Sequence, residues 1–286
     1  MAEIVLGDNA YGKAECRLLR VDRGAGRHEI TDLNVNVALA GDLAATHYTG
    51  DNAPVLPTDT QKNTVYAFAR DGVGQIEDCG LRLARHFVDS QPTILRARVT
   101  IEQYGWDRNG DAGHSFVRGA QTRTATVTCD GAGAWVVSGV SGLTLLNTTN
   151  SEFHGYLKDR YTTLPETTER ILATAVTARW RHAEAACPDW GLSHAEAVRR
   201  LLDAFAGTYS LSLQQTLFAM GRRVLEHRPE LVEVRLSLPN KHHFLIDLSP
   251  FGLDNPDEVY FAADRPYGLI EGAAVREGAP PAGLAW

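Results

Sequence analysis

Alternating apolar and polar residues form the main pattern of the first half of the chain. The pattern is clearest in DLNVNVAL, residues 32–39, where every second residue is apolar. A period of two is typical of strands that bury one face. The first half therefore predicts strands at residues 15–21, 32–39, 94–106, 115–129 and 134–146, with DGAG at 130–133 as a turn.

Helical periodicity is present in two segments between these strands. Apolar residues recur at three- and four-residue intervals in segments 65–69 and 76–87. The second half repeats the order, with a strand pattern at 170–182, helical patterns at 198–205 and 213–224, and strands from 230 to 250. This duplicated order predicts an α+β fold with antiparallel sheets and helices on one face.

Three helix starts match the capping box, in which a Ser or Thr side chain caps the helix and a Glu or Gln three residues later reaches back. They are residues 58–61, 193–196 and 212–215. A capped helix start presents free backbone N–H groups and the positive end of the helix dipole, so it can bind an anion. Because the pattern is common, it assigns no function by itself.

Composition narrows the partners and the compartment. The 286 residues carry a formal net charge of −7, which argues against a nucleic-acid surface and favours a small-molecule substrate. No apolar run reaches the ~20 residues of a membrane span, and the N-terminus lacks signal-peptide features. Four cysteines lie far apart without a CxxC pair, which predicts reduced thiols rather than a zinc knuckle or a disulfide framework: Cys16, Cys79, Cys129 and Cys187.

The segment SLPNKHHF, residues 237–244, raises three alternatives: a metal site, a proton relay or a solvated loop. Adjacent strand residues point to opposite faces, so His242 and His243 do not readily bind one ion together. If the strand stays regular after Pro239, His242 shares the inward face with Phe244, and His243 faces the other way. We therefore expect no metal here.

Familiar cofactor and nucleophile motifs are missing from the sequence. It contains neither GxSxG nor GxGxxG, and GAGAW at 131–135 falls in the predicted hairpin turn. The residues alone leave two classes open, an antiparallel α+β enzyme and a binding protein. Because no cofactor motif is present, the residues alone disfavour an oxidoreductase.

Several segments spread over the chain resemble the urate oxidase (uricase) family. They are YGK at 11–13, TDTQKNTVYAFA at 58–69, residues 149–172 from TNSEFHGY to TTERIL, SLQQT at 212–216, SLPNKHHF at 237–244 and DRPYGLIE at 264–271. The resemblance implies the tunnelling fold, with tandem repeats at 1–140 and 141–286, each an antiparallel sheet with a helix pair. It also implies a homotetramer that encloses a tunnel.

The resemblance implies oxidation of urate by dioxygen and water to 5-hydroxyisourate and hydrogen peroxide, with neither metal nor organic cofactor. Urate is an electron-rich purine that, once deprotonated, can itself reduce dioxygen, which accounts for the missing cofactor motif. Two alternatives remain: another tunnelling-fold enzyme of purines or pterins, and a non-catalytic purine-binding protein. The pterin and cyclohydrolase types anchor the heterocycle with a glutamate, whereas this chain offers Arg170 and Gln214.

The resemblance also implies which residues bind the substrate. Arg170 corresponds to a bidentate arginine, whose planar fork suits the charged edge of a purine. Gln214 both donates to and accepts from the ring, and Phe153 stacks on it. The remaining positions are Leu213, Asn240, which holds dioxygen or water with Thr58, and Asp59, which contributes a backbone N–H.

By the same resemblance, Lys13, Thr58 and His242 form the proton-handling group. Lys13 and His242 relay the proton that lets the Thr58 oxygen accept one from urate. The family builds its pocket from two chains, with the Lys, Thr and Asp positions on one and the others on the second. A Thr58 hydroxyl that caps its helix would be a weaker base, and the residues leave this point open.

The C-terminal segment differs from eukaryotic relatives, which commonly end in a peroxisomal tripeptide. This chain ends GLAW, which is no such signal, so we expect a bacterial cytoplasmic protein. The Pro- and Gly-rich tail, residues 273–286, predicts loose order. Trp190, in a segment without a family motif, is expected to be a packing residue.

Overall fold

A computed structural model describes residues 3–24 and 26–286 of the chain, and it divides into two compact units. Unit 1 contains the residues up to Gly139 together with Arg181–Leu192 and Pro280–Trp286. Unit 2 contains Val140–Trp180 and Ser193–Ala279. The interpretation of the chain as tandem repeats at 1–140 and 141–286 remains a prediction.

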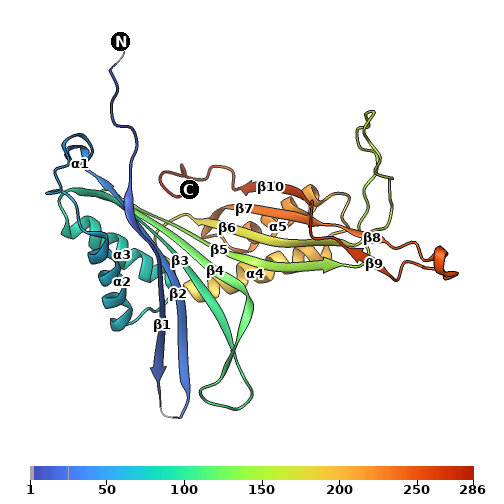
Figure 1. Cartoon of the computed structure of the whole chain (residues 1–286), viewed down its shortest axis with the longest axis horizontal. Helices are drawn as coiled ribbons and strands as arrows, with labels where there is room; N and C mark the ends of the chain where they lie inside the picture. Colours follow the sequence, from blue (N-terminus) through green and yellow to red (C-terminus); the bar gives the residue numbers. More distant parts are fainter. Residues whose placement is uncertain (1–2, 25) are drawn as a thin grey trace. The chain divides into compact units, whose positions relative to one another are not determined.

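Unit 1 is an antiparallel sheet with helices packed on it (Figure 1). Helix α2 packs on β1, and α3 packs on β3 and β4. The strands follow the order β1 (Tyr11–Arg23), β2 (His28–Gly41), β3 (Ile94–Arg108), β4 (Phe116–Asp130) and β5 (Ala134–Asn147). The helices are α1 (Ala44–Thr49), which the sequence pattern did not predict, α2 (Thr58–Asp71) and α3 (Ile76–Ser90).

The core of unit 1 confirms the predicted strand and helix faces. The alternating residues of β2 and the apolar stripe of α3 are each at most 3% exposed: Leu33, Val35, Val37, Leu39, Ile76, Leu83, Ala84 and Phe87. The apolar face of β2 and the apolar stripe of α3 are buried as their repeats predict, and Asp32 and Asn34 on the other face of β2 are buried as well, at 4% and 3% exposure. Trp190 is 3% exposed and packs in this core, as expected.

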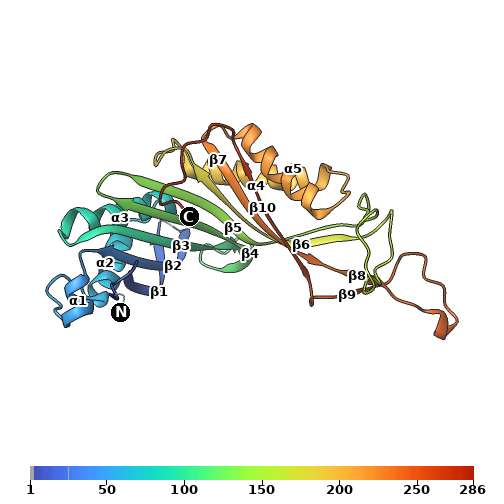
Figure 2. The ribbon, with the colours of Figure 1, turned by 90° about the horizontal axis from the view of Figure 1, so that it is seen from above.

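Unit 2 contains strands with helices packed on them, seen from two directions in Figures 1 and 2. Helix α5 packs on β7 and β10. The strand order is β5, β6 (Leu172–His182), β7 (Leu231–Lys241) and β10 (Gly268–Val275), and the helices are α4 (Trp190–Gly207) and α5 (Leu213–His227). A separate two-stranded sheet joins β8 (His243–Leu245) to β9 (Tyr260–Ala262), and a short 3₁₀-helix, η1 (Ser249–Phe251), lies between them in the chain.

The strands predicted between 230 and 250 are present as β7 and β8, but no single regular strand runs through the two histidines. Strand β7 ends at Lys241, His242 lies outside any strand, and β8 pairs with β9 rather than continuing the main sheet. The assignment of His242 and His243 to opposite faces assumed one regular strand. That assumption fails because the backbone leaves the β7 ladder just before the two histidines.

One of the three predicted helix caps is confirmed. The Ser212 hydroxyl accepts the backbone N–H of Gln215 at 3.2 Å, and the Gln215 side chain accepts the N–H of Leu211 at 2.8 Å. In α2 the N-cap position is Pro57, and the Gln61 amide donates to the Leu56 carbonyl instead of closing a capping box. The Thr58 prediction is therefore wrong, because the helix begins at Thr58 itself.

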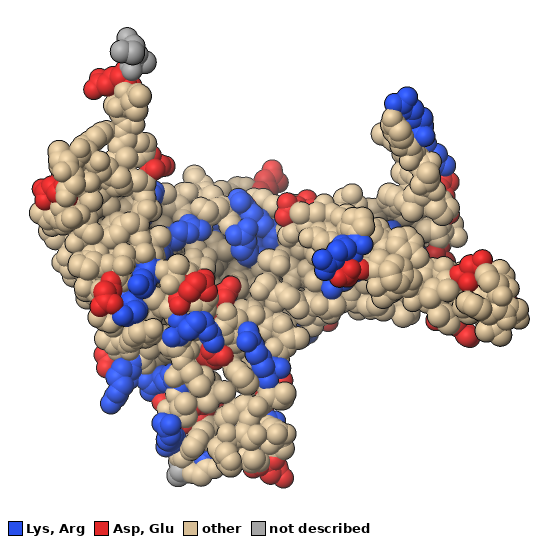
Figure 3. All heavy atoms as spheres, viewed as in Figure 1, with Lys and Arg blue, Asp and Glu red and all other residues tan. Residues whose placement is uncertain are grey.

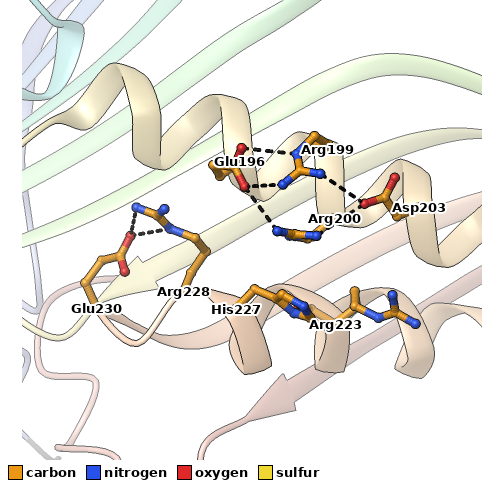
Figure 4. A network of polar contacts seen from close by, with 8 residues as sticks. All are labelled: Glu196, Arg199, Arg200, Asp203, Arg223, His227, Arg228 and Glu230. Atoms are coloured by element: carbon orange, nitrogen blue, oxygen red, sulfur yellow. Dashed lines mark hydrogen bonds and ion pairs between the residues drawn. The ribbon is translucent and has the colours of Figure 1, made fainter.

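The third predicted cap is also wrong, since α4 begins at Trp190, ahead of Ser193. The Ser193 hydroxyl donates instead to Glu230 at 2.7 Å, near a cluster of ion pairs on α4 and at the end of α5 (Figure 4). Arg228 forms an ion pair with the same carboxylate at 2.6 Å, and Arg199 forms an ion pair with Glu196 on α4. These charges are largely satisfied by one another, so the cluster is structural.

The C-terminal tail is better ordered than its composition predicts. Ala285 is 2% exposed, and backbone carbonyls of the tail accept hydrogen bonds from Arg98 and Arg181 within unit 1. The prediction of loose order is wrong because these arginines satisfy carbonyls that Pro and Gly residues leave without helix or sheet partners.

Acidic and basic side chains are interspersed on the face shown in Figure 3. Among the described residues, every helix is too short or too polar to cross a membrane.

Candidate active site

Unit 2 contains a cavity of about 330 Å³ in which four of the predicted site residues meet. They come from three places along the chain: Phe153 and Arg170 before β6, Asn240 at the end of β7, and His242 just beyond it. A volume of this size suits a small flat ligand. The resemblance to uricases therefore grouped residues that the structure also brings together.

The Arg170 side chain is held by a hydrogen bond at Nε, and its terminal nitrogens are available to a ligand. Its Nε donates to the hydroxyl of fully buried Ser151 at 3.1 Å, and its backbone N–H donates to the Ser151 carbonyl at 2.9 Å. Among the described residues, the two terminal nitrogens of the guanidinium have no hydrogen-bond partner. Burial lowers the pKa of Arg170, yet an arginine stays protonated at any physiological pH. A cation with an open fork faces the cavity, which favours an anionic ligand.

Phe153 is part of an aromatic group at the cavity. Its backbone pairs with Thr167 through hydrogen bonds of 2.8 and 3.1 Å. Its ring stacks on Tyr156 with centroids 4.8 Å apart, and the Arg170 guanidinium lies 5.2 Å from its centroid. Tyr156 was not predicted, although an aromatic pair at i and i+3 in FHGY was the available signal.

His242 is suited to accept a proton. Burial, followed by the positive charge of Arg170, lowers the pKa of His242, which favours the neutral imidazole near neutral pH. Its ring lies against Phe244, with centroids 5.7 Å apart. His243 lines the same cavity, so the prediction that it faces away is wrong. Its Nδ1 lies 3.2 Å from the Lys241 carbonyl oxygen.

Leu213 and Gln214 do not line this cavity, although they lie on a connected segment. Leu213 is 2% exposed in the core of unit 2, and Gln214 is exposed in the first turn of α5. The residues just before α5 pair with those around Ser151, because Ser210 and Ser151 form a backbone bridge. The helix start that carries Gln214 is thus tied to the segment that carries Arg170.

The remaining predicted residues, Lys13, Thr58 and Asp59, belong to unit 1. Asp59 pairs with Lys62 on its own helix and accepts from Asn63 at 3.0 Å, and these contacts lower the pKa of its carboxyl. In the part of the chain that the structure describes, the Thr58 hydroxyl has no hydrogen-bond partner. It does not cap α2, so its lone pairs are available to a ligand.

Metal chemistry has little support from the ligand types present. Across the described residues there is no group of three or more His, Cys, Asp or Glu side chains arranged to hold a metal ion. Cys16, Cys79 and Cys129 are buried free thiols, and burial raises the pKa of each. They are therefore neutral thiols rather than thiolates near neutral pH.

Solved structures similar to this chain define its fold class. The crystal structure of uricase from Arthrobacter globiformis has a TM-score of 0.94 at 53% identity and covers 98% of both chains. The urate oxidase from Bacillus sp. TB-90 has a TM-score of 0.82 at 22% identity, over 94% of this chain and all of that one. The molecule therefore has the α+β fold of uricases, with an antiparallel sheet as predicted.

Sequence comparison identifies the family itself. A family model described as Uricase matches residues 9–128 and 136–271. Curated uricases include that of Arthrobacter globiformis, 54% identical over 96% of this chain and 91% of its own length. The uricase of Dictyostelium discoideum is 38% identical over 94% of this chain and 96% of its own. The chain belongs to the uricase family.

Proposed function

We propose that the protein is a urate oxidase, which converts urate, dioxygen and water to 5-hydroxyisourate and hydrogen peroxide. The observation that carries this proposal is the cavity of unit 2, where the open fork of Arg170 meets Phe153, Asn240 and His242 in a chain of the uricase family. The substrate is an electron-rich purine anion that itself supplies the electrons. The protein therefore binds a flat anion, moves protons and holds oxygen.

The binding roles follow from the contacts at the cavity. Arg170 pairs its two unsatisfied terminal nitrogens with the anionic edge of the purine, because a guanidinium matches two adjacent acceptors. Phe153 supplies an aromatic face, and Asn240 supplies an amide that holds dioxygen or water above the ring. Gln214 and Leu213 complete the purine site from the start of α5.

The proton-handling roles fall to Lys13, Thr58 and His242. The unpartnered Thr58 hydroxyl accepts a proton from urate as its own proton passes to Lys13, and neutral His242 completes the relay. Asp59 contributes its backbone N–H, since the first N–H groups of a helix have no partner inside the helix. Its carboxylate is already occupied by Lys62 and Asn63.

We further propose that each site is shared between two copies of the chain in a homotetramer. The cavity is lined by unit 2 residues, whereas Lys13 and Thr58 belong to unit 1. A second copy of the chain then supplies Lys13 and Thr58 to the cavity that holds His242. Large apolar side chains of unit 2 support an interface because they are strongly exposed in the single chain: Leu157 at 99%, Tyr161 at 71%, Phe251 at 73% and Phe261 at 60%.

A reducing, cytosolic compartment fits the cysteines. Cys16, Cys79 and Cys129 are free thiols, and disulfides persist mainly in oxidising compartments. We therefore place the enzyme in the bacterial cytoplasm. Its thiols then have no catalytic role in this proposal.

Loss of urate ultraviolet absorbance, followed together with oxygen uptake, tests the reaction. We expect metal-stripped protein to consume urate and dioxygen in equal amounts and to release hydrogen peroxide. Absence of turnover would contradict the proposed function. Turnover that returns only after addition of a metal would contradict the cofactor-independent chemistry while leaving urate as the substrate.

Complementation between two defective variants tests the shared site. Lys13→Met and Arg170→Ala chains, each nearly inactive alone at low urate, are co-expressed and purified as mixed oligomers. Random assembly gives about a quarter of the sites an intact Lys13 from one chain and an intact Arg170 from another. Recovered activity of that order supports the shared site, whereas no recovery would show that one chain holds the whole site.

A further inference from the structure

The strand that carries Lys13 contains an irregularity directly after it. Lys13 pairs with Val37 of β2, and the next paired residue, Cys16, is opposite Val35. Strand β1 therefore has one residue more than β2 over this interval, and Ala14 and Glu15 together are opposite Asn36. This is the arrangement of a β-bulge, in which two residues of one strand oppose one residue of the other.

The bulge decides which face of the sheet carries Lys13. Cys16 and Leu18 lie in the core beneath α2 and α3, and in an unbroken strand Lys13, three residues before Cys16, would point to the opposite face. The extra residue reverses this, so Tyr11 and Lys13 are partly buried while Gly12 and Ala14 are exposed. Lys13 thus shares the face of β1 on which α2 packs.

The pKa directions of two neighbouring groups agree with a position of Lys13 near α2. The positive charge of Lys13 contributes to lowering the pKa of Asp59, in the first turn of α2, after the larger contribution of Lys62. It also opposes the burial that raises the pKa of Cys16. Both effects are consistent with Lys13 on the face of β1 that is covered by α2.

Specific contacts hold the bulge in place. Glu15 adopts φ = 57°, a left-handed conformation that a residue with a side chain rarely takes. Its backbone N–H donates to the Asn36 side-chain oxygen at 2.8 Å, and its carboxylate accepts from Asn34 at 2.7 Å. The Asn36 contact satisfies an N–H that the bulge removes from the ladder between β1 and β2.

The strand is also fixed on the other side of Lys13. A Cβ atom on Gly12 would lie 1.8 Å from the Val37 carbonyl oxygen, so only glycine fits there. The Tyr11 hydroxyl donates to the Leu56 carbonyl at 3.1 Å and accepts the Leu56 N–H at 2.9 Å. Leu56 lies two residues before Thr58, so these bonds tie the Lys13 strand to the start of α2.

We propose that the bulge at Ala14 and Glu15, held by the Asn36 side chain, is a positioning device that turns Lys13 toward the first turn of α2 and Thr58. Asn36 and Glu15 are positioning residues, because they act through Lys13 rather than on the substrate. This inference rests on the proposed function for the role of Lys13 as a proton acceptor. The placement of Lys13 by the bulge stands apart from that role.

Two matched pairs of variants test the device. Asn36→Ala removes the acceptor of the Glu15 N–H and is expected to lower kcat about tenfold with KM within about twofold, whereas Asn36→Asp keeps an oxygen there and retains most of the activity. Glu15→Val places a β-branched residue at positive φ and is expected to lower kcat about 100-fold, while Glu15→Gly, which tolerates that backbone, keeps it. Equal losses within either pair would overturn the proposal.

A compensating deletion separates the bulge from the Glu15 side chain. Deleting Ala14 in the Glu15→Val chain removes the extra residue, so a regular strand again places Lys13 two positions before Cys16 and on the helix-covered face. We expect kcat to recover about tenfold over Glu15→Val alone. If the deletion restores nothing while the protein remains folded by circular dichroism, the bulge does not set the position of Lys13.

A readout without turnover distinguishes this inference from the proposed function. Reductive ¹³C-methylation labels lysines, and Lys13→Met identifies the Lys13 signal in NMR spectra. We expect the signal to change in Asn36→Ala and Glu15→Val, and to return toward the wild-type position in the Ala14-deleted chain. If the Lys13 signal changes in the variants as expected but the wild-type protein oxidises no urate, the proposed function is refuted and the proposal about the bulge stands. If the wild type is active and the Lys13 signal is the same in Asn36→Ala and Glu15→Val, the proposal about the bulge is refuted.

Discussion

The two units hold their proposed site residues in opposite ways. In unit 2, side chains fix side chains, because Ser151 binds the Arg170 guanidinium and Phe153 lies against it. In unit 1, the backbone positions the residues: a bulge orients Lys13, and Thr58, at a helix start, has a hydroxyl without a hydrogen-bond partner among the described residues. A charge that recognises an anion gains from a fixed direction, whereas a group that exchanges protons needs unoccupied lone pairs.

The largest effect is expected from unit 1, where Thr58→Ala removes the proposed base and leaves the cavity of unit 2 intact. Turnover is expected to fall by roughly two or more orders of magnitude, with KM changed little, because proton transfer rather than binding is lost. Initial rates over a range of urate concentrations measure both constants. Thr60→Ala, in the same helical turn, is the matched control, and an equal loss there would remove Thr58 from its role.

The next largest effect is expected from unit 2 and should show mainly in KM. Arg170→Ala removes a charged fork that makes hydrogen bonds to the anion, and we expect KM to rise about 100-fold, with a smaller change in kcat. The same steady-state rates measure it. Arg160→Ala, an exposed arginine on the neighbouring loop, serves as control. An unchanged KM in Arg170→Ala would remove the contrast between the two units.

A smaller effect tests whether side chains hold Arg170. Ser151→Ala deletes the acceptor of Nε and is expected to raise KM about five- to tenfold while kcat stays near the wild-type value. Thr174→Val is the matched control, since Thr174 is equally buried and its hydroxyl has no hydrogen-bond partner among the residues that the structure describes. Ser151→Thr, which keeps a hydroxyl, should recover part of the affinity. Similar KM values for Ser151→Ala and the control would show that Arg170 orients itself.

The smallest effect concerns pH. Burial, and then Arg170, lower the pKa of His242, so the neutral, proton-accepting form persists to lower pH than for an ordinary histidine. We expect the acidic limb of kcat/KM in the wild type to lie below the usual histidine pKa of about 6.5. Arg170→Gln removes a repelling positive charge, which stabilises the imidazolium and moves the limb to higher pH. A limb that stays fixed in Arg170→Gln would assign it to another group.

Local periodicity predicted much of the fold. The capping pattern and strand alternation gave wrong predictions where a helix began at another residue or a strand ended. The faces of β2 and α3 were predictable because burial follows the repeat of the element itself. Thr58 and Ser193 fit a capping pattern, yet the helix start is decided by the conformation of the preceding residues. His243 was assigned to the wrong face because β7 ends at Lys241.

The candidate site was predictable in its residue types and less so in its arrangement. Family segments named Phe153, Arg170, Asn240 and His242, which the structure brings together around one cavity. Ser151 was missed because a serine in a loop carries no distinguishing local signal, and Tyr156 was missed although its i, i+3 spacing from Phe153 was an available signal. The bulge at Glu15 was missed because a glutamate in the sequence does not indicate a positive φ, as a glycine can.

The sequence by itself determined the alternation of strands and helices, the family, and which side chains have the chemistry to bind an anion and move a proton. These depend on residue type and on spacing along the chain. Only the tertiary structure decided that the Thr58 hydroxyl has no hydrogen-bond partner among the described residues, that Ser151 orients Arg170, and that an extra residue turns Lys13 toward α2. Each of these depends on contacts between residues distant in sequence, which satisfy buried polar groups and select one backbone conformation among several that the local sequence allows.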